Sequence, residues 1–349
     1  MKCTIQNIAD HLGLSRNTVS KALKNSSEVS ENTRNLVIKT ASKLGYKNAT
    51  FATPVIPASE TGSNGTILFL TRTYASDSEF WTTVLRGIES ILSNANYHLA
   101  ISIMSDSDLK QLNFPQTISD SSIKGIILVE ICDKVVCDAL SQFNLPIVSV
   151  DMPNVPFEEL NGIDVVTMES KKNLKKIINQ LIEKGAESFG FVGDLYSTNV
   201  SRGFQERYNA LSECLAEHQL PLNQKNCLLH QTPEDFRNFQ TTVNNLQAMI
   251  SLPDVFICGN DWTAIQLIYA LQFLGFQIPK DICVVGFDNI PAASRISPSL
   301  TTISTPQKYL GIAAARQILE RIQHPNCPHV FCQYETELII RNSTNIISF

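Results

Sequence analysis

The first 47 residues place apolar side chains at the spacing of three short helices. Thr4 can cap the first helix, Gly13 can end it, and Ser15 can cap the second. A third helix begins near Ser30, and the turn between the first two contains a glycine, which predicts a helix-turn-helix in a three-helix head. The expected inward positions are Ile5, Ile8, Ala9, Leu12, Val19, Ala22, Leu23, Leu36, Val37, Ala41 and Leu44.

Residues 48–64 interrupt this pattern and separate the head from the rest of the chain. They are small and polar, include Pro54 and Pro57 and contain no Lys or Arg, which is typical of a linker. From Gly65 onward, apolar runs alternate with helical stretches near 80–94, 170–184 and 262–274. The alternation predicts parallel sheets with helices on both faces, a doubly wound α/β fold. The runs are TILFL, HLAISIM, GIILVE, PIVSVD, SFGFVGD, DVFICGND and DICVVGFDN.

Polar side chains follow several of these predicted strands. Asp151 follows PIVSV, Asp194 follows FGFVG, Asn260 and Asp261 follow VFICG, and Asp288 follows VVGF. Ligands of open α/β sheets bind beyond the carboxyl ends of the strands. The sequence therefore predicts a binding site built from these strand ends.

Charge is distributed unevenly along the 349 residues. Residues 1–48 hold eight basic and three acidic side chains, a net charge of +5, which leaves −10 on the remainder of a chain whose total is −5. A basic head on an acidic body indicates that the head alone contacts a polyanion such as DNA. An ordinary basic helical domain would show the same balance, so charge by itself leaves both interpretations open.

Several classes of protein are poorly supported. No run reaches the roughly 18 apolar residues of a membrane span and the first residues lack an apolar signal segment, so we expect a cytoplasmic protein. Nine irregularly spaced cysteines fit reduced thiols. HPNCPHVFC, residues 324–332, has metal-binding residue types but no second spaced pair, and we expect a loop entering an edge strand. Without a nucleophile elbow or a phosphate-binding loop, we expect no enzyme, no metal and no cofactor.

Five short elements follow one another along the head: Gly13-Leu14-Ser15, Thr18-Val19-Ser20-Lys21, Val29-Ser30, Thr33-Arg34 and Leu44-Gly45-Tyr46. In these elements and their order, the head resembles the headpiece of the LacI/GalR family of transcription regulators. The body resembles the same family in RGIE, GIIL, CGND, IPKDICVVGFDNI, PSLTTI and ELIIRNST.

The resemblance implies a head over 1–47, a linker over 48–64, and an effector-binding and dimerisation domain over 65–349. This domain would contain two subdomains of periplasmic-binding-protein type around a cleft, with three chain crossings. The first subdomain would take about 65–164 plus 290–323, and the second about 165–289 plus 324–349.

The second helix of a helix-turn-helix enters the major groove with its N-terminal side chains at the base edges. Arg16, Asn17 and Lys21 match the family's base-reading positions, although a solvated helix face is the alternative. Hydroxyl-bearing and basic side chains near this helix would contact the phosphates of the DNA. The expected DNA-contacting set is Thr4, Ser15, Arg16, Asn17, Thr18, Ser20, Lys21, Thr33 and Arg34.

The family's hinge helix, of pattern P-N-x-x-A-R-x-L, is degenerate here. The aligned residues Asn48 to Val55 lack the Pro-Asn start, the Arg and the Leu, and Pro54 disfavours a helix. Minor-groove insertion by the linker is therefore not expected from this sequence.

The resemblance also implies a sugar or nucleoside-like effector between the subdomains. Arg207 aligns with the family's effector-contacting arginine, with Arg202 as the alternative. Each candidate could instead be a salt bridge, a helix cap or a core aromatic. The full set is Phe80, Trp81, Asp151, Arg207, Asn260 and Asp288.

Together these features predict an effector-responsive repressor, a homodimer that reads a roughly palindromic operator. Two other classes stay open: a small-molecule binding protein without gene control, and a sugar-processing α/β enzyme with an accessory head.

Overall fold

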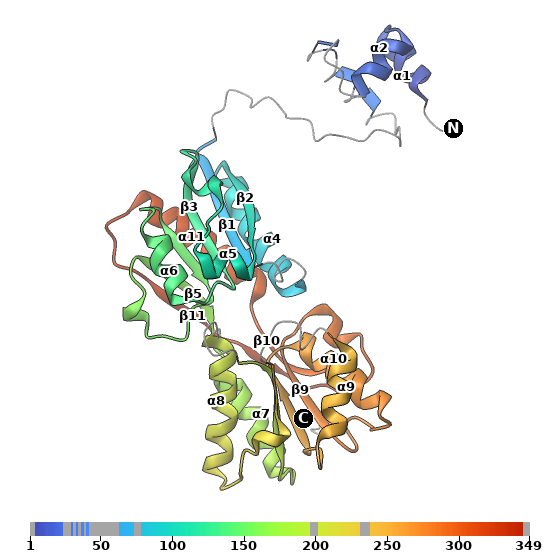
Figure 1. The fold of residues 1–349 in the computed structure, drawn as a ribbon, viewed down its shortest axis with the longest axis vertical. Helices are drawn as coiled ribbons and strands as arrows, with labels where there is room; N and C mark the ends of the chain where they lie inside the picture. The colour runs from blue at the N-terminus through green and yellow to red at the C-terminus, as the bar shows by residue number, and fades with distance from the viewer. Residues whose placement is uncertain are drawn as a thin grey trace. The chain divides into compact units, whose positions relative to one another are not determined.

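The structure, a computed structural model, describes residues 4–23, 29–30, 33, 36–37, 40–41, 63–72, 78–195, 202–230 and 238–344. The chain divides into a head unit, Met1–Gly62, and a body, Ser63–Phe349 (Figure 1). The expected linker lies outside the described residues up to position 62.

The head contains α1 (Ile5–Leu12) and α2 (Arg16–Leu23). Thr4 caps α1 in a capping box with Asn7, and Gly13 ends it at a left-handed φ of 63°. The Ser15 hydroxyl accepts the Thr18 N–H at 3.0 Å at the start of α2. These contacts confirm the caps that the sequence predicts, because the cap side chains satisfy first-turn amides that have no intrahelical partner.

The core of the head is a small apolar cluster of Ile8, Ala9, Val19, Ala22, Val29, Val37 and Ala41. The prediction for Leu36 is wrong, because its side chain is 50% exposed. The buried side of this helical segment passes instead through Val37, Thr40 and Ala41, which follow the i, i+3, i+4 spacing of one helix face. Leu44 and Gly45 lie outside the described residues.

The body has two lobes, each built on one six-stranded sheet. The first sheet has the order β11-β5-β4-β3-β1-β2 and is parallel throughout. Its strands are β1 (Gly65–Arg72), β2 (Tyr97–Met104), β3 (Ile123–Val129), β4 (Ile147–Val150), β5 (Ile163–Met168) and β11 (Phe331–Tyr334). Its helices are α4 (Glu79–Asn94), α5 (Asp106–Gln111), α6 (Lys134–Ser141) and α11 (Gln307–Gln323).

Both faces of the first sheet are covered. Consecutive residues of one strand, such as Ile67 and Leu68, enter two different apolar clusters. One cluster includes residues of α4 and α11, and the other includes residues of α5 and α6. This explains why the strands appear as unbroken apolar runs, since a strand buried on both faces needs no polar alternation.

The second sheet has the order β12-β10-β9-β8-β6-β7, with β12 antiparallel to β10. Helices α7 and α8 cover one face, and α9 and α10 cover the other (Figure 1). Its strands are β6 (Phe189–Asp194), β7 (Leu228–His230), β8 (Val255–Cys258), β9 (Cys283–Asp288), β10 (Thr301–Ser304) and β12 (Glu337–Ile339). Its helices are α7 (Lys172–Glu183), α8 (Arg202–Glu217), α9 (Phe239–Ala248) and α10 (Asp261–Phe273). Short 3-10 turns lie at Gln116–Ser119, Phe157–Glu159, Gln224–Asn226 and Pro291–Ser294.

The chain passes between the sheets three times, after β5, after β10 and after β11. The lobes therefore differ from the expected boundaries at 164, 289 and 323. β5 stays in the first sheet as far as Met168, β10 belongs to the second sheet, and β11 returns to the first. Strand pairing decides these memberships, and such pairing joins residues more than 150 positions apart, as between Cys332 and Val166.

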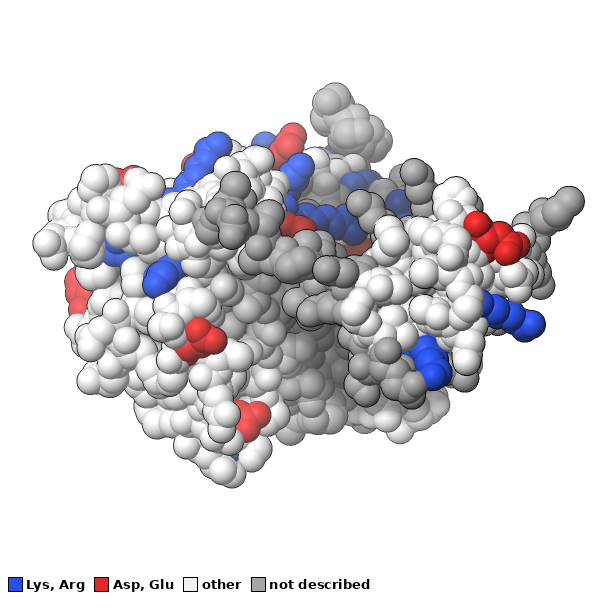
Figure 2. Space-filling model, turned by 90° about the horizontal axis from the view of Figure 1, so that it is seen from above, with Lys and Arg blue, Asp and Glu red and all other residues white. Residues whose placement is uncertain are grey.

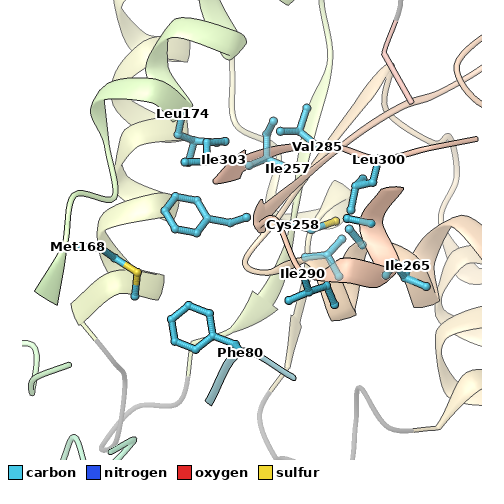
Figure 3. Close-up of a cluster of buried hydrophobic side chains, with 14 of the residues drawn as sticks. Phe80, Met168, Leu174, Ile257, Cys258, Ile265, Val285, Ile290, Leu300 and Ile303 are labelled. Carbon is cyan, nitrogen blue, oxygen red and sulfur yellow. The ribbon is translucent and has the colours of Figure 1, made fainter. Parts of the chain in front are cut away.

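One apolar cluster extends through both lobes. Figure 3 shows Phe80 and Met168 of the first lobe in the same cluster as Ile257, Ile290 and Ile303 of the second. The carboxyl ends of the two sheets are thus held close by shared burial.

HPNCPHVFC forms a loop that enters β11, the edge strand of the first sheet, as the sequence predicts. Arg321 at the end of α11 holds this loop by donating to the backbone carbonyls of Pro325, Cys327 and Pro328. Within the described part of the chain, no group of His, Cys, Asp or Glu side chains could hold a metal ion, and the eight described cysteines are free. No helix in the described ranges is long and apolar enough to cross a membrane.

Candidate functional site

The outer edge of α2 carries the side chains expected to read bases. Arg16 and Asn17 are exposed in its first turn, and Lys21 is half-buried one turn later. Val19 and Ala22 face the core of the head. The buried positions thus orient the helix so that its polar N-terminal side chains face outward.

The hydroxyls expected to contact phosphates also make local bonds. Thr4 donates to Asn7 Oδ1 at 2.6 Å, while the Ser15 and Thr18 hydroxyls lie 2.8 Å apart. The Thr33 hydroxyl lies 2.8 Å from that of Ser30. Ser20 is half-buried on α2, and Arg34 lies outside the described residues. On the molecular face in Figure 2, basic and acidic side chains are scattered among uncharged ones.

In the body, two acidic residues follow neighbouring strands at the carboxyl ends of the first sheet. Val129 of β3 pairs with Val150 of β4, so Glu130 and Asp151 follow these strands at the same level. Both have positive φ, 56° and 115°. In the second sheet Asp194 closes β6 and Asp288 closes β9, the latter with φ of 117°. Strand order reverses at β1 and at β6, and such switch points are where ligands bind in open α/β sheets.

Arg207 of α8 lies against these strand ends. Its guanidinium donates through Nη1 to the Gly259 carbonyl at 2.6 Å and lies 3.6 Å from the centre of the Phe287 ring. The residue is 3% exposed, and its Nε has no hydrogen-bond partner. Burial lowers the pKa of Arg207, while Asp288 and Asp151 oppose this effect. A buried arginine with a spare donor is suited to binding a ligand acceptor.

The carboxylates of both lobes influence one another. Burial raises the pKa of Asp288 well above its ordinary value; Arg207 opposes the shift, and Asp261, Glu130 and Asp151 add to it. Burial likewise raises the pKa of Glu130 to about 7, against the Trp81 hydrogen bond and the charge of Arg72, and with the help of Asp151 and Asp194. The structure thus brings together Asp151, Arg207 and Asp288, three residues of the predicted effector site.

The other predicted effector residues make contacts with neighbouring residues of the protein. Asn260 caps α10, and its Oδ1 accepts the Thr263 N–H at 2.8 Å. Phe80 and Trp81 are buried with ring centres 4.6 Å apart. Trp81 also joins the acidic group, because its Nε1 donates to Glu130 Oε1 at 2.5 Å. Arg202, the alternative to Arg207, pairs with Glu206 at 2.7 Å.

Two residues of this region lie outside the predicted effector set, although Asp261 was among the strand-end polar residues that the sequence pointed out. Glu130 directly follows the run GIILV, so the strand-end pattern that selected Asp151 could also have found it. Asp261 is fully buried; it accepts the Thr302 hydroxyl at 2.5 Å and the Ile290 N–H at 2.9 Å. Burial raises the pKa of Asp261 to about 7, and these hydrogen bonds partly oppose the shift. Asp261 thereby holds the turn that follows Asp288.

A helix-turn-helix head and a two-lobed body with polar strand ends define a ligand-responsive regulator. Residues 4–48 match the family model of bacterial regulatory proteins of the lacI family, and residues 178–344 match that of a periplasmic binding protein-like domain. The chain belongs to the LacI family of bacterial regulatory proteins and is a DNA-binding transcriptional regulator.

Relatives and solved structures agree with this assignment. The chain is 28% identical to the ribose operon repressor of Haemophilus influenzae and 26% identical to the transcriptional repressor PurR of Photobacterium profundum. Each match covers 97% of this chain and 98% of the relative. Its fold is similar to that of the lac repressor dimer bound to operator and the anti-inducer ONPF, with a TM-score of 0.66 at 18% identity over 99% of both chains. It is also similar to the regulator CelR in complex with cellobiose, with a TM-score of 0.68 at 19% identity over 98% of this chain and 100% of that one.

Proposed function

We propose that this regulator represses transcription as a cytoplasmic homodimer, without enzymatic activity. Two heads read the half-sites of an operator through α2, and a sugar or nucleoside-like effector binds at Asp151, Arg207 and Asp288. The observation that carries the proposal is the exposed Arg16 and Asn17 on a helix whose other side is buried in the head core. Full-length protein selecting one fragment from a genomic library at moderate salt would support it, and selecting none would reject it.

Replacing Arg16 with alanine tests whether the exposed side of α2 reads the bases of the operator. Arginine can donate twice to guanine O6 and N7, and a good bidentate pair is worth about 1 to 3 kcal/mol of discrimination. We expect the preference for the selected operator over a scrambled duplex to fall about 5- to 150-fold, with nonspecific affinity nearly unchanged, in titrations at one salt concentration. Arg295→Ala, at an exposed position of the body, is the matched control. Unchanged discrimination in Arg16→Ala would contradict the assigned face.

Exposed aromatic side chains on helix α10 support the proposal of a dimer. It is apolar on nearly all sides, yet Trp262, Tyr269 and Phe273 are exposed, and Phe273 is 69% exposed. Their spacings of seven and four residues align them in one stripe, which a second copy of the chain could bury. The edge strand β2 also exposes Ile101 and Ile103.

Phe273→Asp should therefore weaken the dimer. Exposed aromatics that are buried on association commonly contribute about 2 kcal/mol or more, so we expect the dimer dissociation constant to rise at least about 30-fold. Sedimentation velocity over a concentration series measures this constant. Val135→Asp introduces the same charge at an exposed apolar position of α6 and should leave it unchanged. Equal dimerisation of Phe273→Asp and the wild type would exclude this stripe.

The effector class rests on the groups at the strand ends. Carboxylates accept and guanidinium N–H groups donate, so together they can bind hydroxyls in fixed directions. Solved structures of similar fold hold cellobiose and ribose, which are hydroxylated ligands. Two other functions remain testable: a binding protein without gene control would select no DNA, and an enzyme would consume a sugar or nucleoside in a turnover screen.

A further inference from the structure

The turn that follows β9 has an unusual backbone at the residue expected to bind the effector. Asp288 has a φ of 117° and Asn289 a φ of 56°, both in the left-handed region. For a residue with a side chain the first of these values is sparsely populated and costly, so the surrounding structure has to hold it. The position of the Asp288 side chain therefore depends on the groups that stabilise this turn.

Asp261, the first residue of α10, binds the backbone of this turn. Its Oδ2 accepts the Ile290 N–H at 2.9 Å, and its Oδ1 accepts the Thr302 hydroxyl at 2.5 Å. The Thr302 oxygen in turn accepts the Asn289 N–H at 3.4 Å. The two amides that follow Asp288 thus depend on Asp261, one directly and one through Thr302.

The neighbouring strands leave room for this carboxylate. Asp261 and Thr302 are fully buried, and a Cβ added at Gly286 of β9 would lie 2.2 Å from Asp261 Oδ1, so only glycine fits there. Thr302 pairs with Gly286 across β10 and β9. At the far end of the turn, Ile290 is buried in the same apolar cluster as Ile265 of α10 (Figure 3). The carboxylate and the core therefore fix the turn together.

We propose that Asp261 is a positioning residue of the effector site: it holds the turn that directs the Asp288 side chain toward the effector and contacts no effector itself. This inference rests on the proposed effector site. Asp261 has no exposed surface, and both of its oxygens accept hydrogen bonds within the protein. Bonds to an ionised group are about twice as strong as bonds between neutral groups, so protonation of Asp261 should loosen the turn.

Charged and titratable groups on several elements face Asp261. Burial raises the pKa of Asp261 to about 7, while its hydrogen bonds and the charge of Arg341 oppose the shift. Asp288 of β9 and Arg207 of α8 also interact with it. Burial holds the pKa of the Cys258 thiol well above its ordinary value, so this thiol stays neutral near pH 7. The ionised fraction of Asp261 should therefore rise about tenfold between pH 6 and pH 8.

Amide hydrogen exchange of the full-length protein, measured at residue resolution, reports on the turn without any effector. In the wild type, the protection factor of the Ile290 N–H should rise at least about threefold from pH 6 to pH 8. Asp261→Asn should lower this protection at pH 8 at least about tenfold and abolish the rise.

Asp254→Asn is the matched control for this measurement. Asp254 directly precedes β8, and its Oδ2 accepts the Ser188 N–H at 2.9 Å and the Ser188 hydroxyl at 2.8 Å. This carboxylate thus makes the same two kinds of bond as Asp261, but at the amino end of the sheet. Its replacement should leave the exchange of Ile290 and its pH dependence unchanged.

Calorimetric titration tests the effect on the effector site. Ribose, cellobiose and adenosine are titrated at pH 8, and the compound that binds the wild type most tightly is the probe. Asp261→Asn and Thr302→Val should each weaken the probe at least about tenfold. Thr302→Ser keeps the hydroxyl and should bind the probe as the wild type does, and so should Asp254→Asn. If Asp261→Asn does not fold, the comparison of Thr302→Val with Thr302→Ser decides.

Three outcomes would overturn the inference: unchanged Ile290 exchange in Asp261→Asn, wild-type affinity for the probe in Asp261→Asn, or an equal loss of affinity in Thr302→Val and Thr302→Ser. If none of the three compounds binds the wild type, the proposed effector class is rejected, and the exchange of Ile290 decides on Asp261 by itself. The same preparations are tested for selection of a genomic fragment, and a wild type that selects none rejects the regulator proposal.

Discussion

Replacing Arg321 with alanine should lower the free energy of unfolding of the body by about 3 to 5 kcal/mol, since breaking a buried ion pair leaves an uncompensated charge. Arg321 donates to both oxygens of Asp164, at 2.8 and 3.0 Å, and both residues are buried. It also holds the loop that leads into β11. Urea denaturation followed by near-ultraviolet circular dichroism measures the loss at pH 7.

The loss should depend on pH. Burial alone would raise the pKa of Asp164, but hydrogen bonds from Arg321, Gln317 and the Val330 N–H outweigh it and lower the pKa. A carboxyl with a lowered folded pKa stabilises the fold above its unfolded pKa, near 4, and this contribution disappears as pH falls through the folded pKa. The difference in the free energy of unfolding between wild type and variant should therefore have its largest value at pH 7 and become smaller at pH values below about 4.

An exposed ion pair provides the comparison. Lys134 and Asp138 lie 2.6 Å apart on α6, with both side chains about one third or more exposed. Because exposed pairs contribute about 0 to 1 kcal/mol, Lys134→Ala should change the stability little. If Arg321→Ala unfolded at the same urea concentration as Lys134→Ala, Arg321 would not stabilise the fold as described.

Asp288→Asn should remove most of the effector response and leave operator binding unchanged. Hydrogen bonds to charged groups contribute about 1.5 to 3 kcal/mol, so we expect effector affinity to fall about 10- to 150-fold. The Asp288 backbone carbonyl accepts from Gln307 at 2.6 Å and from Thr305 at 3.1 Å, and these bonds survive the substitution. The measurement is operator binding titrated with the compound that most stabilises the wild type against heat.

Stability provides a second measurement on the same variant. Burial raises the pKa of Asp288, so ionisation destabilises the native body increasingly as pH rises above the unfolded pKa. The asparagine side chain of the variant cannot ionise, and the variant should be at least as stable as the wild type at pH 8. A variant that keeps the full effector response would exclude Asp288 from the site. A response lost together with stability would point to misfolding instead.

Much of the fold could be predicted because its signals are local. Caps at Thr4 and Ser15 lie within three residues of the amides that they satisfy. The alternation of apolar runs and helices follows the chain and was confirmed strand by strand from β1 to β9 where a run was named. Leu36 was one exception, because one helical turn offers several inward-facing choices and only packing decides among them. The lobe boundaries were another, because strand pairing between distant segments decides them.

The site was predicted in part for the same reason. Asp151 and Asp288 directly follow recognisable strands, so a sequence pattern could find them. The bond from Trp81 to Glu130 joins residues 49 positions apart, and no local pattern encodes it. Asn260 satisfied the strand-end pattern, yet its side chain caps α10.

By itself, the sequence determined the two-part organisation: a basic helical head with a polar outer edge on α2, and a body of buried strands that end in acidic residues. Periodicity and capping encode these features, since they depend on neighbours within a turn or a strand. The tertiary structure alone decided that β11 pairs beside β5, that Arg321 neutralises Asp164, and that carboxylates of two lobes interact around Arg207. Those features depend on pairing, burial and charge between distant segments, which exist only once the chain has folded.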